Sequence, residues 1–484
     1  MERSNKAVSG MAWTGLDKIA THAIQFVISI VIARLLMPSD YGIIGMLAIF
    51  IAIAQTFLDS GFANALIQKK GRTEVDYATV FYFNIIVSFL LYGLFYVCAP
   101  YIAAFYNIPV LTDVTRVVTL SLIINGLVIV QTAKLSIELN FRLQAIASII
   151  SVIISGLIGL WLAYIGWGVW ALVYQNVSHS FIRAIILWLY ARWKPLFVFS
   201  FDSFKRLFSF GSKILVSSLI NTVYTNLYTL VIGKTFSATE VGLFNQGNHF
   251  AKLPMQIIQS VVIKVNYPIL SELQDDNERL IQTYKKLLRT PLFILFPILV
   301  GICAVADPMI DVLIGKKWLP CVPLLQVLCI GYMFSPLTTI NLNLLYVKGR
   351  SDLVLKLELI KKPIAFLILF GSIPFGLIWM CIGKAFYEFV AFSFNCYYTK
   401  KLLNYGMSKQ LRELLPIFIN VAVMFVAVSF CMSFFDSSIV KLIIGIIVGI
   451  ISFFSFAYLT KDESLYDAKE IIIERIARFK SRYN

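Results

Sequence analysis

Residues 32–43 read IARLLMPSDYGI, and residues 232–243 read IGKTFSATEVGL. Each stretch ends one long apolar block and begins the next. At an offset of 200 residues the aligned pairs include Ile32 and Ile232, Arg34 and Lys234, Asp40 and Glu240, and Gly42 and Gly242. Chance likeness of two turns is the alternative, but the matching charge, glycine and position favour an internal repeat. Transporters are often built from such repeats, with the substrate site at the repeat interface.

The composition around these stretches is that of a membrane protein. The chain has 484 residues, of which 59% are apolar and 14% are charged, whereas soluble proteins average about 45–50% and about 25%. The mean hydropathy is +0.81. A single soluble core cannot bury so much apolar surface. We therefore exclude a soluble enzyme, a secreted protein and a disordered chain.

Fourteen apolar blocks are long enough to cross a bilayer, which takes about 20 helical residues. Each block is expected to be a helix, because an open strand in lipid leaves backbone groups without partners. The predicted fold is an all-α polytopic membrane protein with two pseudo-symmetric six-helix lobes and two extra helices. The predicted spans are residues 12–35, 41–61, 77–100, 113–135, 143–164, 167–190, 210–233, 241–266, 291–314, 320–346, 353–373, 375–398, 414–435 and 439–459.

The predicted spans divide the chain into five segments. They are an N-terminal lobe (1–190), a cytoplasmic interfacial linker (191–212), a C-terminal lobe (213–400), two additional helices (401–460) and a tail (461–484). Apolar residues recur in the tail at spacings of three and four, and its end is basic. This pattern predicts an amphipathic helix on the cytoplasmic membrane surface. A helix that binds a partner protein is the alternative.

The positive charge predicts the orientation of the chain. The formal net charge is +16, and 28 of the 42 Lys and Arg residues fall in the termini and in alternate loops. Cytoplasmic loops of membrane proteins collect Lys and Arg, so both termini are expected in the cytoplasm. In a soluble protein this charge would suggest nucleic acid, but here we expect no nucleic-acid partner.

The first predicted helix carries a polar stripe. Lys18, His22 and Gln25 fall on one helical face, where they are expected to line a substrate cavity or to hold helices together by hydrogen bonds. A Lys close to a His inside a membrane can exchange a proton against the negative charge of a substrate. Asp17 and His22 are therefore candidate ion-coupling residues. In the alternative, Asp17 pairs with Lys18 near the headgroups and has no role in transport.

The eighth predicted helix has the longest stripe, made of Asn245, His249, Lys252, Gln256 and Gln259. Five polar side chains on one face are not expected to face lipid, because polar groups are costly there. They suit a water-filled vestibule that offers donors to sugar hydroxyls and to anionic oxygens. A helix lying in the cytoplasm or at the membrane interface is the alternative.

Two later spans carry a surplus of lysine. Their charged residues are Lys356, Glu358, Lys361, Lys362, Lys384 and Glu388. Glu358 can pair with Lys362, and Lys384 can pair with Glu388, one turn apart in each case. The remaining positive charge predicts an anion such as a phosphate, bound by Lys361, Lys362 and Lys384, with Glu358 and Glu388 as candidate ion-coupling residues. The alternative is that the lysines reach toward the headgroups.

Motifs of catalysis are absent. The chain has no P-loop, HExxH or GxSxG motif, and its seven cysteines are scattered without a CxxC pair. We therefore expect no enzyme activity, no cofactor, no metal site and no disulfide. Transport is then driven by an ion gradient or by the gradient of the substrate itself.

Ten short strings resemble one family when they are read in order. They are KAVSGMAW, SDYGIIGM, DSGFANALIQKKG, DYATVFYFNI, ELNFR, GWGVWALV, SFGSKILVSSLI, YTLVIGKTFSATEVGLFNQ, LSELQDDNERL and LIKKPIAFLILF. Together they resemble the Wzx-type flippases of the polysaccharide transporter family, particularly the WzxC-like branch. That family belongs to the MOP superfamily, which also contains the MATE drug antiporters and the lipid II flippases. The resemblance runs from Lys6 to about Tyr405.

The resemblance implies fourteen helices in two six-helix lobes around a V-shaped cavity. It implies movement of an undecaprenyl-pyrophosphate-linked glycan from the cytoplasmic to the periplasmic leaflet, with basic cavity residues that contact the pyrophosphate. A glycan polymerase and a chain-length regulator are the expected partners of a monomeric flippase, besides the membrane lipids.

Two other functions compete with a flippase. A MATE-like antiporter of small organic cations would need surplus acid in its cavity, and here the surplus is basic. A membrane enzyme such as a glycan polymerase or ligase would need a sizeable outward loop, and none of the predicted outward loops is long. The flippase is therefore the expected function.

Overall fold

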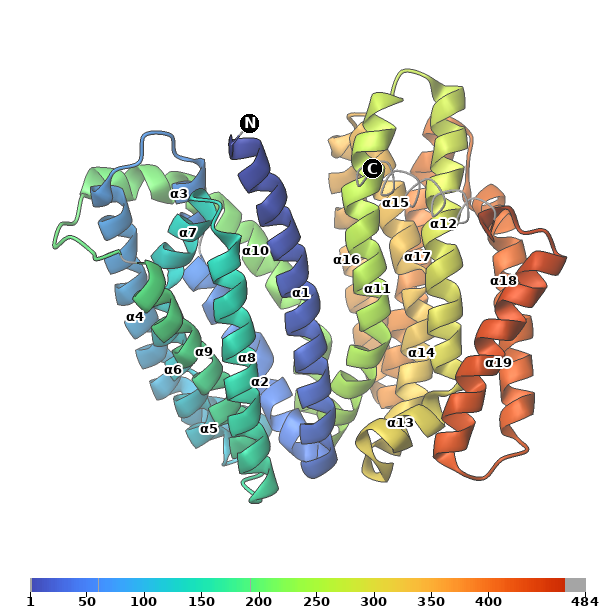
Figure 1. Cartoon of the computed structure of the whole chain (residues 1–484), viewed down its shortest axis with the longest axis horizontal. Coiled ribbons are helices and arrows are strands. Elements are labelled where there is room, and N and C mark those ends of the chain that lie inside the picture. Colours follow the sequence, from blue (N-terminus) through green and yellow to red (C-terminus); the bar gives the residue numbers. More distant parts are fainter. Residues whose placement is uncertain (1, 60, 192, 466–484) are drawn as a thin grey trace. The chain divides into compact units, whose positions relative to one another are not determined.

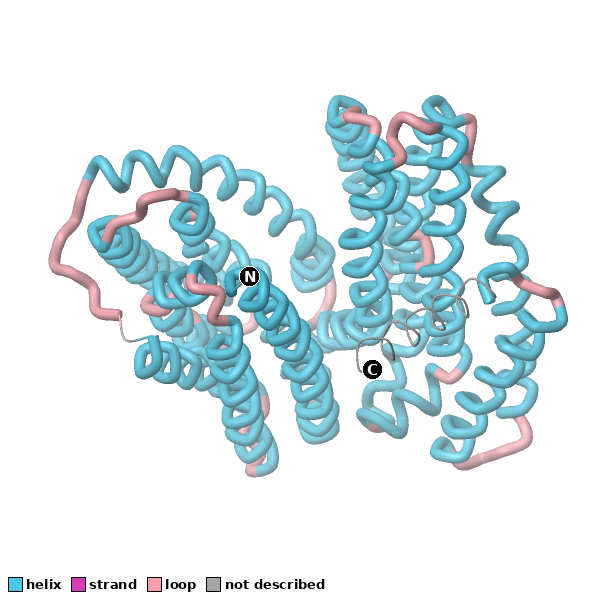
Figure 2. Tube along the Cα trace, turned by 45° about the horizontal axis from the view of Figure 1, so that its top comes forward, coloured by secondary structure: helices cyan, strands magenta, loops and turns pink. Residues whose placement is uncertain are grey.

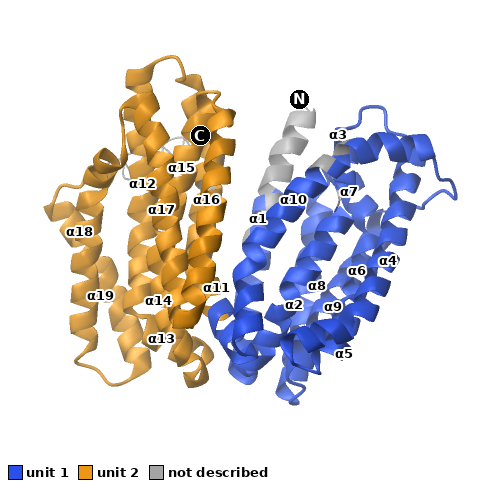
Figure 3. Cartoon of the chain, turned by 180° about the vertical axis from the view of Figure 1, so that it is seen from behind, with its two compact units in different colours: residues 1–245 blue, residues 246–484 orange. Residues whose placement is uncertain are grey.

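The computed structural model describes residues 2–59, 61–191 and 193–465, and these residues form helices and loops without a strand. The contacts divide the chain into two compact units, residues 1–245 and 246–484 (Figure 3). The first unit contains α1 (Glu2–Leu35), α2 (Pro38–Asp59), α3 (Phe62–Gln68), α4 (Glu74–Tyr106), α5 (Leu111–Val118), α6 (Leu120–Gly126), α7 (Ile129–Ile137), α8 (Phe141–Tyr164), α9 (Val169–Ala191), α10 (Phe201–Thr235) and the beginning of α11 (Ala238–Glu272) (Figure 1).

The second unit contains the rest of α11 and the elements that follow it. They are α12 (Asn277–Ala304), α13 (Ala306–Ile314), the 3-10 helix η1 (Lys316–Cys321), α14 (Val322–Tyr332), α15 (Ser335–Val347), α16 (Ser351–Ser372), the 3-10 helix η2 (Ile373–Phe375), α17 (Leu377–Leu403), α18 (Met407–Met432) and α19 (Ser438–Leu459). The unit boundary thus places α10 in the first unit. The predicted lobes, 1–190 and 213–400, place it at the start of the second lobe, and they remain a prediction.

Ten segments within the described residues are long and apolar enough to cross a membrane. All ten overlap predicted spans, although Asn277–Ala304 begins well before the predicted span 291–314, and the all-helical membrane architecture is confirmed. The other four predicted spans are also helices, namely α1, α9, α11 and α16. Charged side chains such as Lys18, Arg183, Lys252 and Lys361 make these four less apolar. A crossing by all fourteen stays a prediction.

Besides residues 291–314, which cover the end of α12 and the whole of α13, two predicted spans are broken in the structure. Residues 113–135 form the three consecutive helices α5, α6 and α7, and residues 320–346 form most of η1, α14 and α15. The second break precedes Pro336, which has no N–H to donate and disfavours a helical residue before it. Each broken span still remains long enough to cross a membrane as a whole.

The two repeated turns have the same local structure. Helix α1 ends at Leu35 and α10 at Thr235, and the next helices begin three residues later in both cases. The carboxylate of Asp40 accepts a hydrogen bond from the backbone N–H of Met37 at 2.9 Å, and that of Glu240 accepts one from Ser237 at 2.9 Å. An acidic side chain in the first turn satisfies a free N–H and interacts favourably with the helix dipole. The repeat is therefore confirmed at this turn.

The aligned glycines of the repeat meet within the first unit. A methyl group on Gly42 would lie 1.6 Å from the carbonyl oxygen of Ala238, and one on Gly242 would lie 1.9 Å from that of Pro38. Helices α2 and α11 therefore cross with their backbones in contact, which only glycine permits. The same residue type is needed at both positions because each glycine lies against the first turn of the other helix.

Helix α10 begins inside the predicted linker and runs without a break to Thr235. The second half of the predicted linker (191–212) and the predicted span 210–233 are thus one continuous helix. Figure 2 shows that the helix curves along its length. The chain before it is fixed on α4, because the indole N–H of Trp193 donates to the carboxylate of Glu74 at 2.7 Å and the N–H of Ser200 donates to Thr79 Oγ1 at 3.1 Å.

The chain after α19 is attached to α12 by Arg289. This buried guanidinium contacts Asp462 at 3.2 Å, Glu463 at 2.5 Å and Glu413 of α18 at 3.5 Å. A buried arginine with several carboxylate partners is strongly held, because removal of the partners leaves a buried charge. The cluster joins α12, α18 and the start of the tail. The predicted amphipathic helix of the tail falls mainly on residues 466–484, which lie outside the described residues.

Candidate functional site

Lys384 of α17 is the centre of a polar cluster in the second unit. Its ammonium donates hydrogen bonds to Asn248 Oδ1 of α11 at 3.0 Å and to the hydroxyl oxygen of Tyr332 of α14 at 3.0 Å. The Tyr332 hydroxyl in turn donates to Asn248 Oδ1 at 2.6 Å. The ammonium also lies 5.2 Å from the centre of the Tyr332 ring, within reach of a cation–π attraction. Three helices therefore hold this positive charge in place.

A second lysine adds to this charge. Lys252 of α11 is half-buried, and the positive charge of Lys384 acts on it. Residues 248 and 252 lie one helical turn apart, so Lys252 is on the face of α11 that carries Asn248. Two neighbouring cations in a partly desolvated place repel each other. An anion with several negative oxygens relieves this repulsion.

A carboxylate also lies within reach of the charge of Lys384. The charges of Lys384 and of Lys361 both act on Glu388 of α17. Lys361 of α16 is 3% exposed and makes an ion pair with Glu358 at 2.8 Å. The sequence predicted Lys362 as the partner of Glu358. That pairing stays a prediction. Lys361 also meets Glu358, because i+3 as well as i+4 neighbours meet on a helix.

The first unit contains a polar cavity of about 590 Å³ between α2, α6, α7 and α9. Such a volume is typical of small-ligand pockets. Apolar walls from Ile44, Ile51 and Val128 surround its polar groups. The polar lining residues are Gln55, Asp59, Ser121, Asn125, Thr132, Asn176, His179, Ser180 and Arg183.

Hydrogen bonds and charges organise this cavity. Asn125 donates to the Gln55 side chain at 3.2 Å, and Gln55 donates to Asp59 at 3.3 Å. Arg183 of α9 is half-buried, and the negative charge of Asp59 attracts its guanidinium. His179 is one turn away from Arg183 and is affected by its charge. The cavity therefore offers amides, hydroxyls and one charged pair, which are groups that bind sugar hydroxyls.

The predicted stripe on the first helix is present on α1. Lys18, His22 and Gln25 are exposed and share one face of this helix. Asp17 accepts a hydrogen bond from Thr21 at 2.9 Å, and its charge acts on Arg183. Asp17 is thus linked to the cavity of the first unit, a connection that the sequence did not predict. The roles of these residues in binding and coupling stay predictions.

The stripe on α11 is divided between the two units. Asn245 belongs to the first unit, where it accepts a hydrogen bond from Thr229 of α10 at 3.2 Å, which is the helix-packing role that intramembrane polar residues often have. His249 and Gln256 are exposed. Lys252 is the member of the stripe that the structure brings to Lys384. Its part in substrate binding stays a prediction.

Several residues of these sites were missed by the sequence analysis. In the first unit, Gln55 with Asp59 and His179 with Arg183 are pairs four residues apart in apolar helices, so the search for polar stripes could have found them. Tyr332 carries no such signal, because it is one of 23 tyrosines in the chain. Its importance follows only from its contacts with Lys384 and Asn248.

Known sequences are similar to this chain over most of its length. The family model described as "Polysaccharide biosynthesis protein" matches residues 31–323. The teichuronic acid biosynthesis protein TuaB of Bacillus subtilis is 28% identical over 353 residues, covering 72% of this chain and 73% of that protein. The succinoglycan biosynthesis transport protein ExoT of Rhizobium meliloti is 26% identical and covers 78% and 77%. The lipopolysaccharide biosynthesis protein WzxC of Escherichia coli is 25% identical and covers 75% and 74%.

Known structures share the fold. The lipid II flippase MurJ in an inward closed conformation has a TM-score of 0.76 at 14% sequence identity, and the match covers 95% of this chain and 100% of that chain. An inward-facing MATE multidrug transporter of the MOP superfamily has a TM-score of 0.58 at 14% identity, covering 80% and 99%. At these identities the likeness is one of fold alone, and a lipid II flippase and a multidrug transporter both have this fold.

Proposed function

Because the chain belongs to the polysaccharide biosynthesis protein family, we propose that it is a flippase for a polyprenyl-pyrophosphate-linked oligosaccharide. The glycan would be a repeat unit of an O-antigen, capsule or exopolysaccharide, moved across the bacterial inner membrane by alternating access. The named relatives support this proposal, since they serve the synthesis of teichuronic acid, succinoglycan and lipopolysaccharide. The chain itself is a multi-pass membrane protein.

The observation that carries the proposal is the pair formed by Lys384, which Asn248 and Tyr332 hold, and Lys252, on which its charge acts. A pyrophosphate needs several positive donors to leave water, because an isolated charge is costly in a medium of low dielectric. Lys384 and Lys252 supply two ammonium groups, and the hydroxyl of Tyr332 keeps one of them oriented. The polyprenyl tail stays in the lipid throughout. A MATE-like antiporter of organic cations is disfavoured, because two lysines repel a cationic substrate.

The sugars need a different environment from the phosphates. Every hydroxyl that leaves water has to find a hydrogen-bond partner or its burial is costly. In our proposal the amides of Gln55, Asn125 and Asn176 and the hydroxyl of Ser180 meet this need in the cavity of the first unit. His22, Gln25, Asn245, His249 and Gln256 are further proposed contacts, together with Lys18, Lys361 and Lys362.

Transport by the purified full-length chain tests this function. We expect liposomes that contain the protein to move a fluorescent polyprenyl-pyrophosphate-linked glycan to the opposite leaflet, where an added glycosidase cleaves it. Liposomes without protein should protect the inner half of the glycan. Uptake of the organic cation ethidium by the same liposomes, with no movement of the glycan, would establish the antiporter in place of the flippase.

We propose that protons can be coupled to this movement through Asp17 and His22 on α1, with Glu358 and Glu388 as further candidates. Protonation and substrate binding would favour each other, because linkage is reciprocal. A pH gradient across the same liposomes should therefore change the flipping rate of the parent chain. The His22→Gln variant should respond less. An equal response of both chains would exclude His22 from coupling, without bearing on the flippase itself.

Both termini are proposed to be cytoplasmic, and this topology has its own test. In intact cells, a cysteine in place of Lys70, between α3 and α4, should not react with an impermeant maleimide, because basic loops stay inside. A cysteine in place of Lys316 in η1 lies in the opposite set of loops and should react. Both residues are exposed, so access in the protein is similar. The parent chain controls for its seven cysteines, and the reverse labelling pattern would invert the topology.

The remaining parts of the proposal concern partners. We infer that the chain acts as a transporter without a catalytic step of its own, as a monomer, and that it hands the glycan to a polymerase with its chain-length regulator. The names of its relatives, a biosynthesis transport protein and a biosynthesis protein, support a transport step within polysaccharide synthesis.

A further inference from the structure

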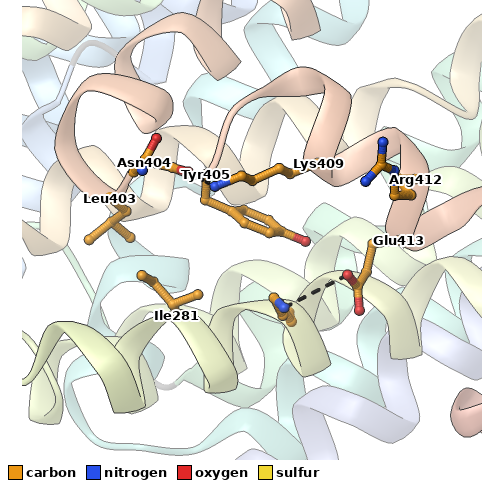
Figure 4. A pocket seen from close by; sticks show the side chains of 8 residues that line it. Ile281, Leu403, Asn404, Tyr405, Lys409, Arg412 and Glu413 are labelled. Atoms are coloured by element: carbon orange, nitrogen blue, oxygen red, sulfur yellow. Dashed lines mark hydrogen bonds and ion pairs between the residues drawn. The ribbon is translucent and has the colours of Figure 1, made fainter.

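A cavity of about 460 Å³ lies in the second unit where α17 ends and α18 begins. Its walls come from α12, from the loop 404–406 and from the first turns of α18. Ile281 and Leu403 make one apolar side (Figure 4). The lining residues have no member in common with the cluster around Lys384, so this cavity is a separate site.

The cavity has a surplus of positive charge. Its lining contains three basic residues, Lys285, Lys409 and Arg412, and one acid, Glu413. The acid is already engaged, since it contacts Arg289 at 3.5 Å and Lys285 at 3.9 Å (Figure 4). Lys409 and Arg412 lie three residues apart on α18, and both side chains are exposed. Their positive charges are therefore accessible at the surface.

Aromatic and backbone groups hold the basic side chains at the cavity. The ammonium of Lys285 lies 5.6 Å from the ring centre of the buried Tyr405. That of Lys409 donates to the carbonyl oxygen of Asn404 at 2.8 Å. Both contacts reduce the freedom of long side chains, which lowers the entropy lost when an anion binds.

An apolar face runs down α18 from this cavity. Leu415, Ile419, Val423, Val426 and Phe430 follow each other at spacings of three and four and are all exposed. Helix α18 is one of the ten segments suited to cross a membrane. The basic cavity and the apolar stripe thus match the two parts of a phospholipid. The cavity suits the charged headgroup, and the stripe suits the hydrocarbon chains.

We propose that this cavity binds the phosphate of an anionic phospholipid, with the acyl chains along the exposed face of α18. Phosphate oxygens suit Arg412 and the two lysines, because charge-assisted hydrogen bonds from such groups are strong. Basic pockets on the cytoplasmic side of membrane proteins select anionic lipids in this way. The bound lipid would tie α12 to the end of α17 and the start of α18, independently of the transported substrate.

Native mass spectrometry of the detergent-solubilised full chain tests the site. With phosphatidylglycerol and phosphatidylcholine offered together, we expect the parent chain to retain phosphatidylglycerol preferentially. In the double variant Lys409→Gln/Arg412→Gln its affinity should fall about 30-fold, since each basic group near a membrane surface contributes about fivefold. Equal retention of phosphatidylglycerol by parent and double variant would overturn the proposal.

Two controls separate the site from general charge and from folding. Lys401→Gln removes an exposed lysine at the end of α17 that does not line the cavity, and it should leave retention unchanged. The charge-preserving variant Lys409→Arg/Arg412→Lys should bind as the parent does. Inorganic pyrophosphate should not displace the lipid. Displacement by pyrophosphate would mean that the cavity recognises a free anion, and the assignment to a phospholipid would be wrong.

Discussion

Replacement of Lys384 by Met is expected to lower the rate of glycan flipping about 100-fold at limiting substrate. Hydrogen bonds to a charged group contribute about 1.5–3 kcal/mol each, and a loss of about 2.7 kcal/mol corresponds to about 100-fold. Methionine retains most of the volume of the lysine side chain but removes the positive charge that, in our proposal, binds the pyrophosphate. The hydrogen bond between Tyr332 and Asn248 does not involve Lys384 and should remain. The measurement is the initial flipping rate in liposomes.

Two variants decide whether this loss is specific. Lys356→Met removes a lysine of α16 that is exposed, and it should retain the parent rate. Lys384→Arg keeps the charge and should recover part of the activity, although the guanidinium fits the Asn248 and Tyr332 contacts differently. A Lys384→Met protein that folds normally and flips at the parent rate would remove Lys384 from the substrate site.

Replacement of Gly42 by Ala is expected to destabilise the protein by about 3 kcal/mol, at the upper end of the usual range for overpacking. The new methyl carbon would lie 1.6 Å from the carbonyl oxygen of Ala238, which belongs to the backbone and has to move. The better helix propensity of alanine, about 1 kcal/mol, offsets part of the clash. Thermal unfolding in detergent, followed by the fluorescence of the tryptophans, measures the change.

The matched control for this prediction is Gly93→Ala in α4. A methyl group on Gly93 would meet nothing within 4 Å, so this variant should be as stable as the parent or slightly more stable. Gly242→Ala should resemble Gly42→Ala, because its methyl group would lie 1.9 Å from the carbonyl oxygen of Pro38. The double variant should lose less than both single losses added together, since one movement of α2 away from α11 relieves both clashes. Stability equal to the parent in Gly42→Ala would disprove the close crossing.

Local sequence features predicted the elements of the fold well. The turn at Asp40 and Gly42 and its copy at Glu240 and Gly242 showed the repeat, because capping carboxylates and glycines act within a few residues of themselves. Helix breaks were predicted less well. The interruption before Pro336 divides one predicted span. The span predicted to begin at Phe210 instead continues a helix that begins at Phe201, since the glycine at 211 weakens a helix without ending it.

The candidate site was predicted in part. Lys252, Lys384 and Glu388 were expected from charge in apolar helices, and the structure brings their charges near one another. The pairing of Glu358 with Lys362 stays a prediction, and the ion pair of Glu358 with Lys361 was not predicted. Helical periodicity allows several neighbours of similar separation, and the packing of other helices decides which one a carboxylate meets.

By itself the sequence determined that this protein is a helical membrane protein with a repeated turn and with basic residues concentrated in alternate loops, because hydropathy, capping and loop charge act over short distances along the chain. Only the tertiary structure decided which side chains share a site. Asn248, Tyr332 and Lys384 come from α11, α14 and α17, and Asp59 and Arg183 come from α2 and α9. A helix presents a different set of residues on each of its faces, and the face that meets a neighbour is selected by packing between segments far apart in the chain.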